Sequence, residues 1–405
     1  MSESSKSQPA VCLLIGTFHP RVGGGETHAR LLSRELKALG TPIFVLTRKH
    51  EPGLPSRDEV DGVELRRVGP SGFPRFGKYL MIPAALRALI QARNEFDIIY
   101  VCGLRVLGIA GILAGLLLHK RVVLRAEACG EWSGGFFFTG AGNTERKLNP
   151  FLRIALALRN RLYRRADQFL AISRVIHNEF STGGLPDTQI TTITNGIDFQ
   201  SFQPVSPERR AQLRADFGLN NSFVFAYSGK LNRGKGLEML LRAWRNVAAS
   251  HPSAHLLLIG AGGTQFLSCE HELRSFVEEN ALQTSVTFTG YTNRVAEYLC
   301  ASDAFVFPSE SEALGLALIE AMACGLPSLA SATGGILDIV TDQENGRLLP
   351  VGDENAWQTA MSELMQTPEQ ATQWAAAGAA SVKKRFAIRE IAIQHQQLFR
   401  SLQTK

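Results

Sequence analysis

The chain has 405 residues, of which 45% are hydrophobic and 20% are charged, and its formal net charge is +6. This composition is typical of a globular protein and excludes a disordered or fibrous chain, while the length predicts two domains. The basic balance suits an anionic ligand or an anionic surface. Because the sequence has no zinc-finger pattern and no RNA-binding aromatic motif, we expect no nucleic acid partner.

The cysteines and the apolar segments bear on the cellular compartment in which the protein works. Six cysteines are scattered without a C-x-x-C pair or a Cys/His cluster, which argues against disulfides or structural zinc and favours reducing conditions. The longest apolar run, Val106–Leu118, is shorter than the roughly 20 residues that cross a bilayer, so we expect a buried helix there. The polar first segment lacks an apolar signal core. Together these features predict a cytoplasmic protein.

Short β-branched segments alternate with helical segments along most of the chain. The strands are expected at 11–18, 42–47, 62–68, 97–103, 121–127, 168–173 and 190–196, and then at 222–229, 255–262, 286–291, 304–309, 327–332 and 346–351. Helices are expected between them, as at 26–39, 236–249 and 354–365. This alternation predicts two doubly wound α/β domains with parallel sheets, joined by a polar linker at 198–219. Ligands bind at the carboxyl ends of strands in such sheets.

A glycine loop follows the first expected strand. Gly23, Gly24 and Gly25 precede a helix that we expect to begin at Glu26. Glycines at a helix N-terminus let backbone N–H groups approach a phosphate or a sugar, although a plain tight turn explains the same residues. The loop does not match G-x-G-x-x-G, so a nicotinamide cofactor is not expected.

Three cations follow the first expected strand of the second half. Lys230, Arg233 and Lys235 precede a helix that we expect to begin near Gly236. The helix dipole repels cations at that end, and a bound diphosphate would resolve the conflict, whereas the alternative is a solvated loop. After the next strand, Gly262 lies in LIGAGG, which matches half of a dinucleotide loop and is weak evidence alone.

Two carboxylates, Glu312 and Glu320, lie eight residues apart in a segment with helical composition that stops at Gly325. On a helix they would point to the same side about 12 Å apart, which is too far for a catalytic pair and suits two contacts along an elongated ligand. The alternative for Glu320 is a pair with an internal cation. The backbone amides of Ala313, Leu314, Gly315 and Leu316 would form an anion site at the helix N-terminus.

These motifs, in this order, resemble the family-4 retaining glycosyltransferases. The resemblance rests on GGGETHARLLSRELKALG, TNGIDFQSFQP, SGKLNRGKGLEMLLRAW, VTFTGY, ASDAFVFPSESEALGLALIEAMACGLPSLASATGG and NGRLLPVGD, and it covers nearly the whole chain. It implies the GT-B fold, in which two Rossmann-like domains face each other across a cleft. The domains would span 1–200 on the acceptor side and 201–385 on the donor side. The last segment, 386–405, would form a helix that packs back on the first domain.

The resemblance also implies roles for individual residues. Glu320 would hold the ribose of a nucleotide-sugar donor, and Glu312 would lie near the transferred sugar. Lys230 and Lys235 would bind the donor diphosphate, with Arg233 and Gly262 beside them. Gly23 and Gly24 match the loop that closes over the donor. Such enzymes retain the anomeric configuration and need no cofactor and no catalytic metal ion.

The sequence departs from the family pattern at two places. The family usually has Arg at the position of Lys230, and a Lys keeps the charge but loses the bidentate geometry. Many members carry a His after a first-domain strand, where this chain reads VVLRAEACGEWSGG without a His. Arg125, Glu127 and Glu131 are the acceptor-side candidates in that segment. The alternative is that these residues form surface ion pairs.

The leading hypothesis is therefore a retaining glycosyltransferase that moves a hexose from a UDP- or GDP-sugar to a glycan, a lipid-linked acceptor or a small molecule. The alternatives are a non-catalytic nucleotide-sugar sensor or scaffold on the same fold, and a dinucleotide-dependent oxidoreductase or epimerase. Segments 75–93 and 146–167 combine basic and apolar residues at helical spacing. Such helices either contact an anionic membrane peripherally, on its inner face, or face their own sheet.

Overall fold

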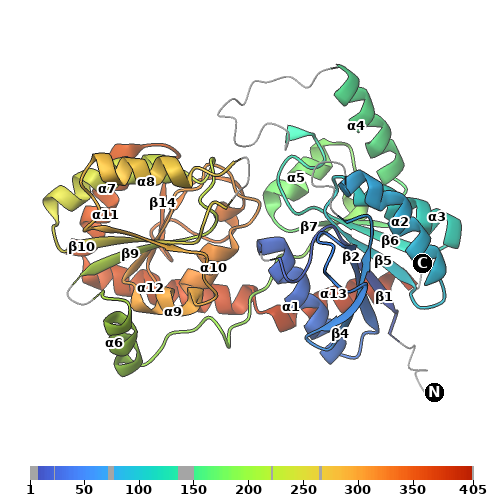
Figure 1. Cartoon of the computed structure of the whole chain (residues 1–405), viewed down its shortest axis with the longest axis horizontal. Coiled ribbons are helices and arrows are strands. Elements are labelled where there is room, and N and C mark those ends of the chain that lie inside the picture. The colour runs from blue at the N-terminus through green and yellow to red at the C-terminus, as the bar shows by residue number, and fades with distance from the viewer. Residues whose placement is uncertain are drawn as a thin grey trace. The chain divides into compact units, whose positions relative to one another are not determined.

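The computed structural model describes residues 8–21, 23–71, 77–135, 150–219, 222–263 and 267–403. These residues divide into two compact units (Figure 1). One unit contains the described residues between 8 and 135 together with 150–196 and 388–403, and the other contains those between 197 and 387. Each unit has a largely parallel sheet with helices on both faces, so the two expected α/β domains of Rossmann type are confirmed.

The sheet of the first unit has the order β3-β4-β2-β1-β5-β6-β7-β8 among the described residues. Its strands are β1 (Val11–Ile15), β2 (Ile43–Arg48), β3 (Arg57–Val60), β4 (Val63–Val68), β5 (Ile98–Cys102), β6 (Arg121–Arg125), β7 (Gln168–Ala171) and β8 (Ile190–Thr192). All neighbours are parallel except the hairpin β3–β4, which the sequence pattern did not predict. The strand order reverses between β1 and β5, which pair in parallel.

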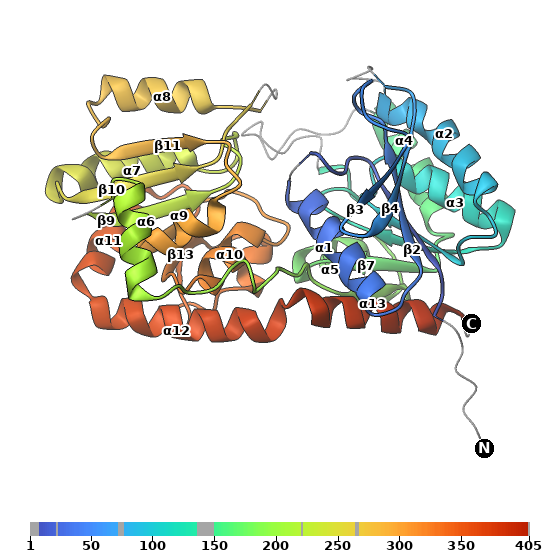
Figure 2. The same ribbon diagram turned by 60° about the horizontal axis from the view of Figure 1, so that its bottom comes forward.

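Six helices of the described residues cover this sheet. They are α1 (Gly24–Ala38), α2 (Gly77–Gln91), α3 (Leu107–Leu118), α4 (Pro150–Tyr163), α5 (Arg174–Thr182) and α13 (Ile388–Gln403). The C-terminal α13 packs against α1, so the expected return of the chain end to the first unit is confirmed (Figure 2). The helix α3 packs on β5 and β6 and lies between α2 and α4. The sequence predicted a buried helix here. One side of α3 is buried, whereas Leu113, Leu116 and Leu117 on its other side are exposed.

The sheet of the second unit has the order β11-β10-β9-β12-β13-β14, and all of its strand pairs are parallel. Its strands are β9 (Phe223–Ser228), β10 (Ala254–Ile259), β11 (Val286–Gly290), β12 (Ala304–Phe307), β13 (Ser328–Ser331) and β14 (Arg347–Leu349). This is the strand order of a Rossmann fold, and it reverses between β9 and β12. The crevice at such a reversal is where these sheets bind ligands.

The helices of the second unit are α6 (Pro207–Asp216), α7 (Leu237–Ser250), α8 (Glu270–Glu279), α9 (Val295–Ala301), α10 (Leu316–Ala323), α11 (Glu354–Gln366) and α12 (Pro368–Arg385). Helices α7 and α8 lie on one face of the sheet, and α9, α10 and α12 lie on the other (Figure 2). The expected linker 198–219 is therefore not wholly a linker, because it contains α6. Ser206 caps that helix by accepting the Arg209 amide hydrogen, at 3.3 Å.

The buried cores consist of the inward faces of these elements. In the second unit the fully buried Trp244 packs edge-on against Phe225. In the first unit Tyr100 packs against His395 and Phe399 of α13, which attaches this helix to β5.

None of the helices in the described part of the chain combines the length and apolar content that crossing a bilayer requires.

Candidate functional site

Two loops meet where the strand order of the second sheet reverses. The loop 229–236 follows β9, and the loop 308–315 follows β12. The Glu310 amide donates to the Gly234 carbonyl at 3.0 Å, which joins the two loops. Gly236 has a φ of 69°, and a Cβ there would lie under 3.0 Å from the Pro308 carbonyl oxygen. Only glycine fits this close approach, so Gly236 sets where the first loop ends and α7 begins.

A charged pair spans the two loops. The Lys235 ammonium contacts the Glu312 carboxylate, and the Ser309 hydroxyl donates to the same carboxylate oxygen at 3.0 Å. The Lys235 side chain is 30% exposed and the Glu312 side chain 13%, so the pair lies in a largely desolvated position that solvent still reaches. The structure thus brings together two predicted site residues that are 77 positions apart in sequence.

The other predicted cations point elsewhere. Arg233 pairs with Glu272 of α8, with Nη2 and Oε1 2.7 Å apart. Lys230 is exposed, and its ammonium has no partner among the described residues. The Gly262 amide donates to a Glu270 carboxylate oxygen at 2.8 Å, so it is already occupied. Of the predicted cluster, Lys235 alone contacts another predicted site residue within the described ranges.

The helix that carries Glu320 is shorter than its sequence predicts. It begins at Leu316, because Gly315 adopts a left-handed conformation with a φ of 110°. Glu312, Ala313 and Leu314 precede the helix, so the prediction that both carboxylates project from one helix is wrong. The anion site that was expected at the amides of residues 313–316 is therefore placed at the first turn of the observed helix instead. The amide hydrogens of a helix that lack carbonyl partners belong to its first turn, which here starts at Leu316.

Glu320 has no ionic partner in the described part of the chain. The described residues place neither a cation nor a hydrogen-bond donor on its carboxylate, which argues against the alternative of an internal ion pair. Its neighbours Leu318, Ile319 and Met322 are buried apolar residues. The side chain retains some solvent exposure, yet burial among these neighbours raises the pKa of Glu320 to about 8. An uncompensated acid in such a position is typical of a group that a ligand completes.

Two glycines at this site were missed by the sequence analysis. A short 3₁₀-helix, Gly334–Asp338, follows β13, and the Gly335 amide donates to the Glu312 carbonyl at 2.9 Å. A Cβ on Gly334 or on Gly335 would lie under 3.0 Å from the carbonyl oxygens of Glu312 and Ala313, respectively. These glycines therefore fix the backbone of the loop that carries Glu312. Adjacent glycines directly after an expected strand were the available signal.

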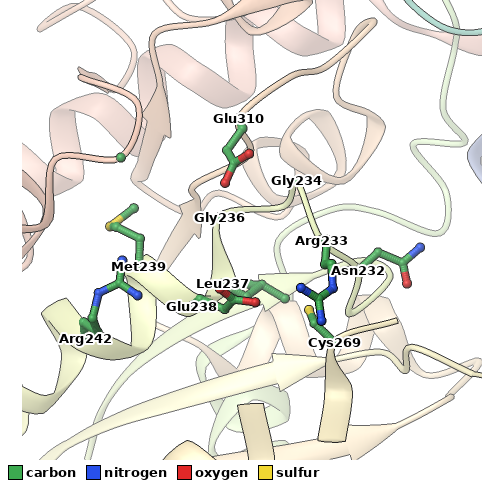
Figure 3. A pocket seen from close by; sticks show the side chains of 11 residues that line it. Asn232, Arg233, Gly234, Gly236, Leu237, Glu238, Met239, Arg242, Cys269 and Glu310 are labelled. Carbon is green, nitrogen blue, oxygen red and sulfur yellow. The ribbon is translucent and has the colours of Figure 1, made fainter. Parts of the chain in front are cut away.

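A pocket of about 450 Å³ opens beside the first loop (Figure 3). Its lining comes from the loop 232–236, from α7, from the loop after β12, from Cys269 at the start of α8 and from Gly352 after β14, and it includes Asn232, Arg233, Leu237, Glu238, Met239, Arg242 and Glu310. Lys235, Glu312 and Glu320 are not part of that lining. The pocket therefore lies on the α7 side of the loop and is distinct from the charged pair at the strand-order reversal.

The first unit has its own loop site at the carboxyl ends of β1, β5 and β6. Gly23 is the N-cap of α1 in an extended conformation, and the Thr17 hydroxyl donates to Glu26 in the first turn of that helix. A Cβ on Gly25 would lie under 3.0 Å from a carboxylate oxygen of Glu127. The Glu127 carboxylate thus lies against the start of α1, next to the glycine loop.

Two buried residues hold Glu127. Arg125, 1% exposed, pairs with it at 3.1 Å and donates to the Asn195 side-chain oxygen at 2.6 Å. Glu131 accepts the amide hydrogens of Glu127 at 3.2 Å and Leu104 at 2.9 Å, and burial raises its pKa. Arg125 and Glu131 are buried, so they do not form surface ion pairs, contrary to that alternative.

Among the described residues, no group of His, Cys, Asp and Glu side chains is arranged to hold a metal ion.

The fold and the site together define a class. Two Rossmann-type units, a C-terminal helix on the first unit, and a carboxylate–cation pair at the strand-order reversal of the second are the features of a GT-B glycosyltransferase. The model of Glycosyltransferase Family 4 matches residues 22–201, and the model of Glycosyl transferases group 1 matches residues 209–381. The chain belongs to glycosyltransferase family 4 and transfers a sugar from a nucleotide-sugar donor.

Similar proteins span the whole chain. It is 25% identical over 393 residues to N-acetyl-alpha-D-glucosaminyl L-malate synthase of Bacillus anthracis, covering 96% of both chains. It is 27% identical over 386 residues to a GDP-mannose-dependent alpha-(1-6)-phosphatidylinositol monomannoside mannosyltransferase of Mycolicibacterium smegmatis, covering 90% of this chain and 92% of that one. Membership of this family excludes the alternative of an oxidoreductase or epimerase.

Solved structures share the fold. HepE of Anabaena in complex with UDP and glucose superposes with a TM-score of 0.78 at 20% identity, covering 97% of this chain and 100% of that chain. Sucrose-phosphate synthase of Thermosynechococcus elongatus superposes with a TM-score of 0.81 at 24% identity, covering 98% of this chain and 99% of that chain. These likenesses establish the fold.

Proposed function

We propose that this enzyme transfers a hexose, with retention of anomeric configuration, from a UDP- or GDP-sugar to a glycan, a lipid-linked acceptor or a small molecule. The observation that carries the proposal is the Lys235–Glu312 pair at the strand-order reversal, with Glu320 uncompensated on the adjacent helix α10. HepE of Anabaena, which shares the fold, binds UDP-glucose. The mannosyltransferase of Mycolicibacterium smegmatis depends on GDP-mannose.

In this proposal the donor site lies along the second unit. The ribose hydroxyls donate to Glu320, and the diphosphate lies against Lys230, Lys235 and the first-turn amides of α10. These groups stabilise the charge that develops on the departing diphosphate. Lys235 would exchange its contact with Glu312 for phosphate oxygens, which leaves Glu312 free to contact the transferred sugar. A donor phosphate oxygen would assist deprotonation of the acceptor, and no metal ion takes part.

The acceptor side is assigned to the first unit. Among the three acceptor-side candidates, we propose that Glu127 contacts the acceptor, because its carboxylate lies against the glycine loop and is partly exposed. Arg125 and Glu131 are buried and hold Glu127 in place, so they act as positioning residues. Gly23 and Gly24 leave the backbone at the start of α1 accessible to the donor.

A thermal-shift screen with UDP, GDP, ADP and their sugars tests the donor. A ligand that binds the native state raises its melting temperature by mass action, so the correct donor gives the largest shift. Glu320→Gln should abolish that shift, whereas the matched variant Glu279→Gln on an exposed helix position should keep it. Unchanged donor affinity and turnover in Glu320→Gln would refute the site. Tight binding without any release of sugar, with acceptors present, would favour a sensor.

A further inference from the structure

One side of the first unit carries an unusual concentration of exposed apolar side chains. Of the twelve large hydrophobic residues exposed among the described residues, eight lie on α2, α3 and α4. They are Tyr79, Leu80, Leu113, Leu116, Leu117, Phe151, Ile154 and Leu158. Contiguous apolar surface on adjacent elements marks an interaction site more often than scattered residues do. Since α3 packs between α2 and α4, these helices form one layer, which we call the α2–α4 layer.

The clearest part of this layer is α4. Leu156 and Tyr163 are buried and face the protein, whereas Phe151, Ile154 and Leu158 are 81%, 61% and 63% exposed. A helix advances 100° per residue, so this second set lies almost opposite the first. The expectation that the segment faces its own sheet accounts for Leu156 and Tyr163 but leaves the larger apolar stripe on α4 without a partner.

The charge of the layer favours an anionic partner surface. The helices α2, α3 and α4 contain five Lys or Arg residues and no Asp or Glu, although the whole chain has 37 acidic residues. Arg153 and Arg161 of α4 and Arg87 of α2 are exposed. Helices that lie on an anionic bilayer carry Lys and Arg beside an apolar face, and the residues of this layer fit that pattern.

We propose that the α2–α4 layer docks this enzyme on an anionic lipid bilayer. Phe151, Ile154 and Leu158 insert between the acyl chains, and Arg153 and Arg161 pair with lipid phosphates at the interface. This inference concerns the first unit alone and does not depend on the proposed donor site. If both hold, the acceptor side of the enzyme works at a membrane surface, which favours a lipid-linked acceptor over a soluble one.

Vesicle flotation tests the proposal with the full chain. The wild type should float with vesicles of phosphatidylcholine and phosphatidylglycerol at about 0.1 M salt and should dissociate substantially at about 0.5 M salt. It should not float with phosphatidylcholine alone. Phe151→Ser/Ile154→Ser/Leu158→Ser should lower the bound fraction by about fivefold or more. The matched control Val205→Ser/Val351→Ser, which removes exposed apolar side chains of the second unit, should bind as the wild type does.

A charge-reversal pair separates the electrostatic contribution from the apolar one. Arg153→Glu/Arg161→Glu should lose flotation, whereas Lys383→Glu/Lys384→Glu on α12 changes the net charge equally and should keep it. All variants should retain the donor-induced thermal shift, so loss of docking and loss of the donor site give different results. No flotation of the wild type at low salt would overturn the proposal. So would self-association through α4, detected by sedimentation velocity as a dimer that the triple variant loses.

Discussion

The carboxylate of Glu127 occupies the space that a side chain at position 25 would need. A Cβ on Gly25 would lie under 3.0 Å from one oxygen of Glu127, while the other oxygen pairs with the buried Arg125 at 3.1 Å. The first turn of α1 and the loop after β6 are thus fitted to each other across 102 residues of sequence. The carboxylate thus lies beside the N-terminus of α1.

Gly25→Ala should therefore destabilise the first unit by about 1–3 kcal/mol, because Glu127 cannot move away without breaking its pair with Arg125. The measurement is the urea midpoint of unfolding. Gly53→Ala, at a glycine with open space around its Cβ, is the matched control and should be nearly neutral. Gly25→Ala/Glu127→Ala should recover part of the loss, and an effect that is strictly additive would argue against the contact.

Glu312→Gln should separate nucleotide binding from sugar transfer. Removing the negative charge frees Lys235 for the diphosphate, so free UDP or GDP should bind several-fold more tightly, by about 1 kcal/mol. Transfer should fall about tenfold or more, because the proposed contact with the sugar loses its charge. Isothermal titration and a sugar-release assay measure the two quantities. Glu310→Gln, two residues away, should change neither, and weaker nucleotide binding in Glu312→Gln would contradict the arrangement.

Donor affinity should depend on pH through Glu320. Its pKa of about 8 in the empty site means that the carboxyl is mostly protonated at pH 6 and mostly ionised at pH 9. Ribose hydroxyls donate more strongly to the ionised form, so the donor should bind more tightly as pH rises. The gain should be at most about tenfold per pH unit below about pH 8.

Titrations of the nucleotide sugar between pH 6 and pH 9 measure this slope. Glu320→Gln should bind weakly at every pH without the slope, whereas Glu344→Gln, at an exposed position, should keep it. A slope that persists in Glu320→Gln would assign the titration to another group.

His395 should contribute to loss of stability in acid. His395 packs against Tyr100, whose hydroxyl oxygen is 3.0 Å from Nε2 of His395. Burial lowers the pKa of His395 to about 3. Its folded-state pKa lies below its unfolded value near 6.5, so the unfolded chain gains a proton first as pH falls. The stability of the first unit should therefore drop by about 2 kcal/mol between pH 8 and pH 5 from this residue.

His395→Gln should flatten this part of the pH profile, measured by urea unfolding at pH 5 and pH 8. His271→Gln, on the exposed side of α8, should leave the profile unchanged. Arg125 also lowers the pKa of His395 through its charge, and the His28 ring packs beside it, so removal of the Arg125 charge should reduce the drop in stability. An unchanged profile in His395→Gln would contradict the assignment.

The sequence predicted the parallel sheets well, because alternating apolar strands and helices have distinct periods. It predicted the α10 helix less well. The composition of residues 312–323 is helical throughout, yet Gly315 adopts a left-handed conformation that delays the helix to Leu316. A propensity pattern could not reveal this, because the preceding loop packs against Gly334 and Gly335 from a distant segment, and the Gly335 amide occupies the Glu312 carbonyl.

The site was predicted unevenly for a related reason. Lys235 and Glu312 were selected separately from their loops, and their contact follows from the order of β9 and β12 in the sheet. The pair of Arg233 with Glu272 and the donation of the Gly262 amide to Glu270 depend on where α8 lies, which local patterns do not specify. Likewise, the contact of Glu127 with Gly25 depends on how β6 and α1 are positioned relative to each other, which local patterns do not specify.

The return of α13 to the first unit bears on how this protein is made and how it can be recombined. Residues 388–403 pack on α1, and His395 and Phe399 pack on Tyr100 of β5, so the first unit stays incomplete until this segment has been synthesised. The second unit, continuous between 197 and 387, can fold beforehand. An exchange of first units between two such enzymes must therefore transfer two separated segments, the residues before 197 and the helix α13, as a matched set.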